Sequence, residues 1–388
     1  MLGLVLVLAA AAAMMSCVLT WIVRAAARRR GLTDSPGVAA QVKHVRRIPN
    51  VGGIAIFWAI VGPMLAGLLA LRVLGDETVG DFWPSIGPFL EGMRGQTPLA
   101  AGFAGSLLLL HLAGLIDDRR PLGPGSKLAV MFGAALVMVT GFDVRLLTFL
   151  DSYVGGQWLS ISLTVIWLVA ITNALNFMDN MDGLAGGVGV VAGSLFLAAA
   201  LLNEQWFVAM TLALLVGALV GFLVFNFPWR RDGATIFMGD GGSLVVGFLL
   251  AFLTVRTTYI DPQGRGEVAA TSGAWYGVLM PVFVLAVPLY DMASVVVIRL
   301  SQGRSPFIGD RQHFSHRLLH RGLSVRQALA VICGCTAVTG ISGIIVGRVA
   351  PWQAALLGGQ SLIVVAILAL YEHASRPKAI DRTAGAEP

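Results

Sequence analysis

Carboxylate side chains are grouped in short motifs within an otherwise apolar chain. Asp117 and Asp118 are adjacent, Asp179 and Asp182 are three residues apart, and Asp240 lies in a glycine-rich segment. Adjacent carboxylates repel one another unless a cation lies close by, and Mg²⁺ and Mn²⁺ prefer oxygen ligands. Backbone N–H groups in a glycine-rich turn at a helix start can bind phosphate. These motifs indicate metal-assisted chemistry on a phosphorylated molecule, although each alone also fits a solvated loop or a helix cap.

Histidine and arginine side chains form a second group near the end of the chain. His313 and His316 have the i, i+3 spacing that a zinc pair on a helix would need, but the sequence offers no compelling third ligand. Arg317 and further basic residues follow directly, which favours contact with a diphosphate. A plain basic loop remains the third interpretation of this segment.

The composition predicts which elements must position these residues. Hydrophobic residues make up 56% of the 388 residues and charged residues only 12%, against about 25% charged in soluble domains. A bilayer span needs about 20 mainly apolar residues, and a backbone in lipid must satisfy its own hydrogen bonds as a helix. We therefore expect an all-α integral membrane protein with about eleven spans, with ten as the alternative; two of the runs, 127–141 and 241–256, are short. The apolar runs are 1–24, 51–73, 98–116, 127–141, 158–176, 183–202, 206–226, 241–256, 275–299, 326–347 and 352–371.

The distribution of basic residues predicts how these spans are oriented. Arg24 and Arg28 follow the first run rather than precede it, which favours a retained helix with its N-terminus outside. With alternation from there, only six of the 27 Lys and Arg residues fall outside: Arg72, Arg94, Arg145, Arg256, Arg265 and Arg348. All the motifs above then lie at the cytoplasmic face, as do Asn173 and Asn176 at the end of the fifth run. An active site for a water-soluble phosphorylated substrate is expected there.

One acidic residue lies inside an apolar run. Asp291 is about eight residues, or roughly 12 Å, from the cytoplasmic end of the ninth run. Carboxylates within a membrane are costly and usually face a polar interior. Support of a head-group site and pairing with another helix are both consistent with this position.

The motifs taken together resemble the polyprenyl-phosphate N-acetylhexosamine-1-phosphate transferase superfamily, glycosyltransferase family 4. The resemblance covers the chain from the second span to the tenth, and it is nearer to the WecA/TagO-like branch than to the related MraY branch. Ser315 stands where the WecA-like pattern often has a further histidine, while His316 keeps the final position. The matching stretches are VKHVRRIPNVGG at 42–53, GLIDDRRPLGPGSKL at 114–128, NALNFMDNMDGLAGG at 173–187, NFPWRRDGATIFMGDGGSLVVGF at 226–248 and SPFIGDRQHFSHRLLHRG at 305–322.

The resemblance implies a function and a set of site residues. It implies transfer of N-acetylhexosamine-1-phosphate, foremost GlcNAc-1-phosphate, from a UDP-sugar to polyprenyl phosphate in the bacterial cytoplasmic membrane, with Mg²⁺ or Mn²⁺ as cofactor. Asp240 is the first choice for a metal ligand and Asn176 the second, and Asp117 and Asp118 would orient the lipid phosphate or accept its proton. The substrate-binding candidates are Lys43, Arg47 and Lys127 for the lipid phosphate, His313, His316 and Arg317 for the donor diphosphate, and Asn173, Asp179 and Asp182 around the uridine or its loop.

Other functions and details stay open at this point. A proton-coupled transporter would place its acids near the bilayer midplane, usually in repeated halves, and a lipid-binding scaffold would not need so many carboxylates on an arginine-rich face. Direct displacement is favoured over a covalent intermediate on Asp117. We expect a single transmembrane domain over 1–371, a disordered cytoplasmic tail over 372–388, and no nucleic-acid partner. The donor sugar, the lipid length and whether the chain forms a homodimer are not determined by the sequence.

Overall fold

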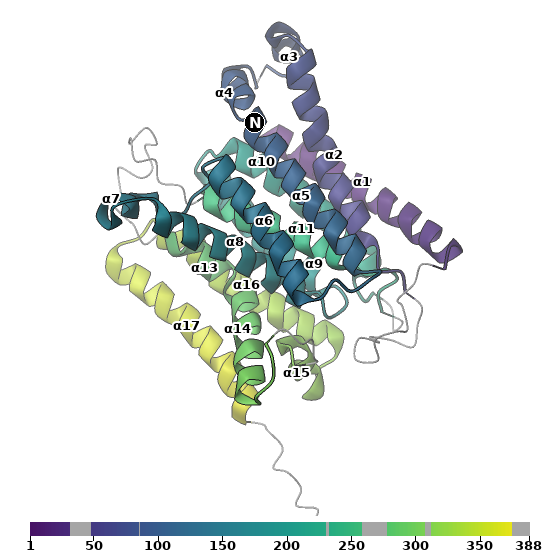
Figure 1. Cartoon of the computed structure of the whole chain (residues 1–388), viewed down its shortest axis with the longest axis vertical. Coiled ribbons are helices and arrows are strands. Elements are labelled where there is room, and N and C mark those ends of the chain that lie inside the picture. The colour runs from purple at the N-terminus through teal and green to yellow at the C-terminus, as the bar shows by residue number, and fades with distance from the viewer. Residues whose placement is uncertain (32–47, 85, 230–232, 258–277, 307–311, 375–388) are drawn as a thin grey trace, which may run out of the picture.

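The apolar runs form long helices that pack into one bundle (Figure 1). The computed structural model describes residues 1–31, 48–84, 86–229, 233–257, 278–306 and 312–374. Within them, ten helices are long and apolar enough to cross a membrane. They are α1 (Leu2–Arg29), α2 (Gly52–Val73), α5 (Thr97–Asp117), α6 (Pro124–Gly141), α8 (Trp158–Met178), α9 (Leu184–Leu202), α10 (Trp206–Asn226), α11 (Asp240–Thr257), α16 (Val325–Val346) and α17 (Pro351–Ala374). The prediction of an all-α integral membrane protein is confirmed.

The ninth predicted run differs from the others because it is divided into two helices. α13 (Met280–Val284) and α14 (Ala286–Ser301) meet at Leu285, where φ is −101° and ψ is 16°. Pro288 lies four residues after Val284, has no N–H to donate to its carbonyl and crowds it with its ring, so a continuous helix is disfavoured there. The two runs that seemed short, by contrast, form full-length helices, α6 and α11.

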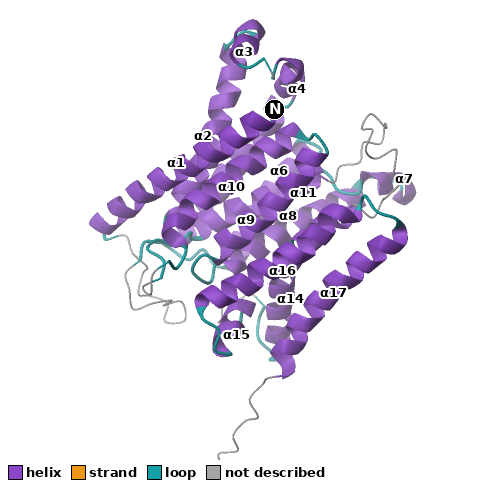
Figure 2. Cartoon of the chain, turned by 180° about the vertical axis from the view of Figure 1, so that it is seen from behind, coloured by secondary structure: helices purple, strands orange, loops and turns teal. Residues whose placement is uncertain are grey.

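Short elements cap the two ends of the bundle, as the two opposite views show (Figures 1 and 2). α15 (Phe314–His320) lies at the end where α14 finishes. The connections at the other end contain the remaining short helices: α3 (Asp76–Phe82), η1 (Gly87–Phe89), α4 (Leu90–Gly95), η2 (Thr148–Leu150) and α7 (Asp151–Val154).

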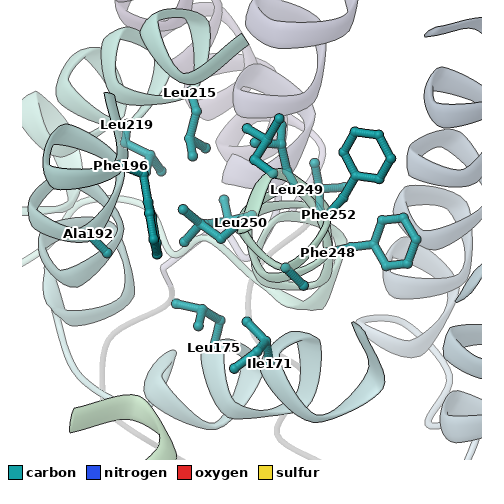
Figure 3. Packing of buried hydrophobic residues seen from close by; sticks show 14 of the residues in the cluster. Ile171, Leu175, Ala192, Phe196, Leu215, Leu219, Phe248, Leu249, Leu250 and Phe252 are labelled. Carbon is teal, nitrogen blue, oxygen red and sulfur yellow. The ribbon is translucent and has the colours of Figure 1, made fainter. Parts of the chain in front are cut away.

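α11 lies at the centre of the bundle and positions the site. In its span, 89% of the residues are buried, against 17% in each of α1 and α17, which run along the periphery. Phe248, Leu249 and Leu250 of α11 point toward the surrounding helices in Figure 3, where Phe196 of α9 is among their neighbours. The helices packed around α11 hold its start in a defined place.

Glycines allow the start of α11 to approach its neighbours at backbone distance. A Cβ on Gly114 of α5 would lie 2.4 Å from the Gly241 nitrogen, and one on Gly53 of α2 would lie 2.3 Å from the Gly242 nitrogen. No larger residue fits at these crossings without separating the helices. The end of α5 and the start of α2 are thereby brought against the residue that begins α11, Asp240.

Candidate active site

The loop before α11 is fixed to the start of α2 by backbone hydrogen bonds. The Gly52 N–H donates to the Phe237 carbonyl at 2.9 Å, and the Gly53 N–H donates to the Met238 carbonyl at 2.8 Å. Gly239 follows with a φ of 71°, a left-handed conformation that favours glycine. Asp240 therefore enters the helix from a defined direction.

Four helices bring polar side chains together around Asp240. The Lys127 ammonium of α6 lies 2.7 Å from Oδ2 of Asp117 at the end of α5, and it also pairs with Asp240. The Asn176 amide of α8 donates to Oδ1 of Asp240 at 2.7 Å and to the Ser243 hydroxyl at 2.8 Å. We name these four residues, Asp117, Lys127, Asn176 and Asp240, the acidic cluster; in sequence they span 124 positions.

Asp118 contacts the backbone of the same helix start. Its Oδ1 accepts from the Asp240 N–H at 2.9 Å and from the Asn50 amide at 3.0 Å, and its Oδ2 accepts from the Gly241 N–H at 3.2 Å. Burial, and next the neighbouring Asp240 carboxylate, raise the pKa of Asp118 to about 8, although the two backbone N–H groups oppose this shift. A cation bound beside Asp240 would favour the ionised form of Asp118 again.

The two adjacent aspartates, Asp117 and Asp118, thus differ in the groups that their carboxylates contact. Asp117 pairs with the Lys127 side chain and accepts from the Leu122 N–H at 2.7 Å, so it orients a cation. Asp118 accepts from backbone N–H groups at both oxygens, so it orients the start of α11.

This difference predicts distinct effects of the two asparagine variants. We expect both Asp117→Asn and Asp118→Asn to lower the transfer rate more than about tenfold, or about 1.4 kcal/mol of barrier. Only Asp118→Asn should also lower the melting temperature, because its new NH2 group would face an N–H donor where an oxygen accepted one. Initial rates and thermal unfolding in detergent test this. Unchanged rates in both variants would remove the pair from the mechanism.

The acidic cluster fits a Mg²⁺ ion better than a closed metal site. Within the described parts of the chain, no three His, Cys, Asp or Glu side chains are grouped closely enough to enclose a metal. Mg²⁺ commonly uses one or two carboxylates and completes its shell with waters and substrate phosphates. The Lys127 ammonium between Asp117 and Asp240 marks a place where positive charge is stabilised. Asn176 would bind a cation through its Oδ1, so its amide would have to turn from the contact it makes here.

Asp182 lies beside the loop that leads to α11 rather than in the acidic cluster. Asp182 is 9% exposed, and its Oδ2 accepts from the Ala234 N–H at 2.8 Å. Asn226 assists by donating to the Ile236 carbonyl at 2.9 Å. Asp179 caps the end of α8, and its charge acts on Asp118. Nucleotide contact by Asp179 and Asp182 stays a prediction, and Asp182 has in addition a clear role in holding the loop.

The predicted diphosphate residues lie at the start of α15 and along it, and side chains of α14 contact two of them. His313 Nδ1 lies 2.9 Å from Oδ2 of Asp291, whose role the sequence left open between pairing with another helix and support of a head-group site. Arg317 donates to the Ser294 hydroxyl at 2.8 Å, and His316 is half-buried on the same short helix, α15.

Among the remaining candidates, the Asn173 amide contacts the Met292 sulfur at 3.7 Å. Lys43 and Arg47, the candidates for the lipid phosphate, lie outside the described residues.

Three polar residues near the acidic cluster had not been singled out. Asn50 and Ser243 lie inside stretches that carried the resemblance, and they contact Asp118 and Asn176 respectively. His111 is buried within α5, stacks on Phe57 with ring centroids 4.3 Å apart, and has Nδ1 2.7 Å from the Gly241 carbonyl. A lone histidine two turns before the paired aspartates was the available signal.

Comparisons with known proteins agree on one family. The family model for glycosyl transferase family 4 matches residues 100–258. The chain is 28% identical over 357 residues to a Bacillus subtilis protein named probable undecaprenyl-phosphate N-acetylglucosaminyl 1-phosphate transferase, covering 91% of this chain and 86% of that one. It is 33% identical over 308 residues to a Mycobacterium tuberculosis decaprenyl-phosphate N-acetylglucosaminephosphotransferase, covering 74% and 70%. With the undecaprenyl-phosphate alpha-N-acetylglucosaminyl 1-phosphate transferase of Escherichia coli K12 it shares 26% identity over 329 residues, covering 83% and 78%.

Proposed function

The chain belongs to glycosyl transferase family 4, the polyprenyl-phosphate N-acetylhexosamine-1-phosphate transferases, and we propose that it transfers GlcNAc-1-phosphate from UDP-GlcNAc to a polyprenyl phosphate, releasing UMP. The observation that carries this proposal is the acidic cluster, in which two carboxylates, an ammonium and an amide from four helices meet at one end of the bundle. The names of the relatives supply the sugar and the lipid phosphate. The product would be a lipid diphosphate sugar that begins a cell-envelope glycan.

The site is proposed to face the cytoplasm from a bacterial inner membrane. The chain has multiple membrane-spanning helices, and the relatives named above are bacterial. By alternation of the spans along the sequence, only six of the 27 Lys and Arg residues fall on the side opposite the acidic cluster, and the positive-inside rule then supports a cytoplasmic position for the cluster. UDP-sugars are made in the cytoplasm, so this orientation gives the donor direct access.

The reaction brings two anions together, and the side chains of the acidic cluster address that problem. An oxygen of the lipid phosphate attacks the β-phosphorus of the donor, a new P–O bond forms, and the bond to UMP breaks. Transfers of this kind depend on positioning and on neutralising charge. Lys127 can exchange its contact with a carboxylate for one with a phosphate, while Asp117 keeps its ammonium in place. Mg²⁺, or Mn²⁺ in its stead, held by Asp240 and Asn176 would supply charge that stabilises the leaving phosphate.

Asp117 suits a positioning role better than a nucleophilic one. Its Oδ1 accepts from the Leu122 N–H and its Oδ2 pairs with Lys127, so both oxygens are engaged. The lipid phosphate needs no strong base, because the second pKa of a phosphate monoester is about 6. Direct displacement is therefore the mechanism we propose. A sugar phosphate found covalently on the protein in the absence of lipid would contradict it.

The test of the function is a transfer assay with a panel of donors. Purified protein in detergent is incubated with polyprenyl phosphate, Mg²⁺ and radiolabelled UDP-GlcNAc, and label in the organic phase is measured together with UMP. We expect UDP-GlcNAc to be the best donor among UDP-GalNAc, UDP-QuiNAc and UDP-MurNAc-pentapeptide, and chelation to stop transfer until Mg²⁺ or Mn²⁺ is restored. A different best donor would correct the sugar. No transfer from any donor would count against the whole proposal.

A further inference from the structure

α14 carries two buried charged side chains that the proposed reaction does not use. Asp291 is 1% exposed and Arg299 is 2% exposed. A buried charge within a membrane protein is costly unless it is paired and hydrogen-bonded. The groups that Asp291 and Arg299 contact therefore indicate the roles of these two side chains.

Both side chains hold the segment that contains the predicted diphosphate residues. The two oxygens of Asp291 contact His313 Nδ1 at 2.9 Å and the Phe314 N–H at 2.6 Å, so the carboxylate grips the start of α15. Arg299 donates to the Pro306 carbonyl at 2.6 Å, ahead of the same segment in sequence. Ser294, one turn after Asp291 on the same face of α14, accepts from Arg317 at 2.8 Å.

The same segment is in contact with the end of α8, where the acidic cluster lies. The His313 ring meets the Phe177 ring edge-on, with centroids 5.4 Å apart, and Phe177 directly follows Asn176 in the chain. The Arg299 guanidinium lies 5.7 Å from the centroid of the same ring. The Ser315 hydroxyl donates to Asn180 three residues further on. A displacement of His313 would therefore change the packing beside Asn176, which contacts Asp240.

We propose that Asp291 is a positioning residue for the sugar-nucleotide donor and acts through His313; this role rests on the proposed function. The carboxylate accepts from Nδ1–H and so assigns the proton of a neutral His313 ring to that nitrogen. Nε2 is then the nitrogen with which the ring meets the donor. Nε2 of the neutral ring can accept from an N–H or hydroxyl group of the donor, and Nε2–H of a doubly protonated ring can donate to a diphosphate oxygen. The same arrangement orients histidines in metal sites and catalytic triads.

The experiment measures steady-state constants for both substrates in Asp291→Asn, His313→Asn and the double variant. We expect each single variant to raise KM for UDP-GlcNAc about tenfold or more and to leave KM for the lipid phosphate within about twofold, because only donor contacts are lost. The double variant should raise the donor KM no more than His313→Asn alone does, since Asp291 acts through His313. The matched control, Asp143→Asn, removes a carboxylate that pairs with Arg145 at the other end of the bundle and should change neither constant.

Several results would overturn the positioning role. Losses that add up in the double variant would show that Asp291 and His313 act separately. A fall in kcat with both KM values unchanged, or equal increases in both, would show a structural role only. If Asp291→Asn does not fold, His313→Asn alone provides the test, and an unchanged donor KM there would overturn the role, because Asp291 is proposed to act through His313. A wild-type protein that transfers from no donor would instead refute the proposed function, and the positioning role with it.

Discussion

Asp240→Ala is expected to abolish transfer, with less than about one-thousandth of the wild-type rate remaining even at saturating Mg²⁺. The variant removes the carboxylate that we propose as the main metal ligand. It also leaves the Lys127 ammonium with Asp117 as its remaining carboxylate in the acidic cluster, and it removes one of the two acceptors of the Asn176 amide. Lys127 would then neutralise Asp117 rather than a phosphate. Transfer of label to lipid, measured over a range of Mg²⁺ concentrations, tests the prediction.

The control for this variant is the same substitution at an exposed acid. Asp81→Ala on α3 changes a solvent-exposed side chain outside the acidic cluster and should keep the wild-type rate and melting temperature. Asp240→Ala should itself remain folded, because the Asp240 N–H that Asp118 holds belongs to the backbone. Near-normal turnover of Asp240→Ala at saturating Mg²⁺ would refute its assignment as a ligand.

The sequence predicted the fold well because a membrane restricts the choices. Runs of apolar residues have to become helices in lipid, and ten of the eleven predicted runs each formed one continuous helix. The division at Leu285 was not predicted, since hydropathy averages over a run and takes no account of a single proline. Pro288 was visible in the sequence, and its missing N–H is the physical reason for the break.

The sequence also predicted which motifs would meet, but not how their side chains are directed. Alternation of the spans delivered Asp117, Asn176 and Asp240 to one place, as expected. Spacing alone could not show that Asp118 turns toward backbone N–H groups while its neighbour turns toward a lysine. Adjacent residues at a helix end point in different directions, and their contacts depend on what the other helices bring.

Contacts between distant segments were the least predictable part of the site. The sequence favoured neither of the two roles of Asp291, and it gave no sign that the two carboxylate oxygens would contact His313 and Phe314. His111 gave no periodic signal, because a single histidine in an apolar run is as compatible with a satisfied core residue as with a functional one. The backbone crossings at Gly53 and Gly114 were likewise hidden, since glycines are frequent in membrane helices.

Gly114→Ala is expected to lower the transfer rate at least about a hundredfold and to lower the melting temperature. Its new Cβ would lie 2.4 Å from the Gly241 nitrogen and 2.5 Å from the Asp240 carbonyl carbon, and these are backbone atoms that cannot move aside as a flexible side chain would. α5 and α11 would have to separate, which costs about 1–3 kcal/mol by overpacking. Asp118 lies one turn after Gly114, so the separation would stretch its hydrogen bonds to the start of α11.

Gly105→Ala is the matched control, because it adds the same methyl group to the same helix where no atom lies within 4 Å. Alanine has the higher helix propensity by up to about 1 kcal/mol, so this variant should keep its rate and unfold at the same or a slightly higher temperature. Rates and thermal unfolding in detergent, measured side by side, separate the close approach from helix propensity. If Gly114→Ala behaved like Gly105→Ala, the distance between α5 and α11 would not control the position of Asp240.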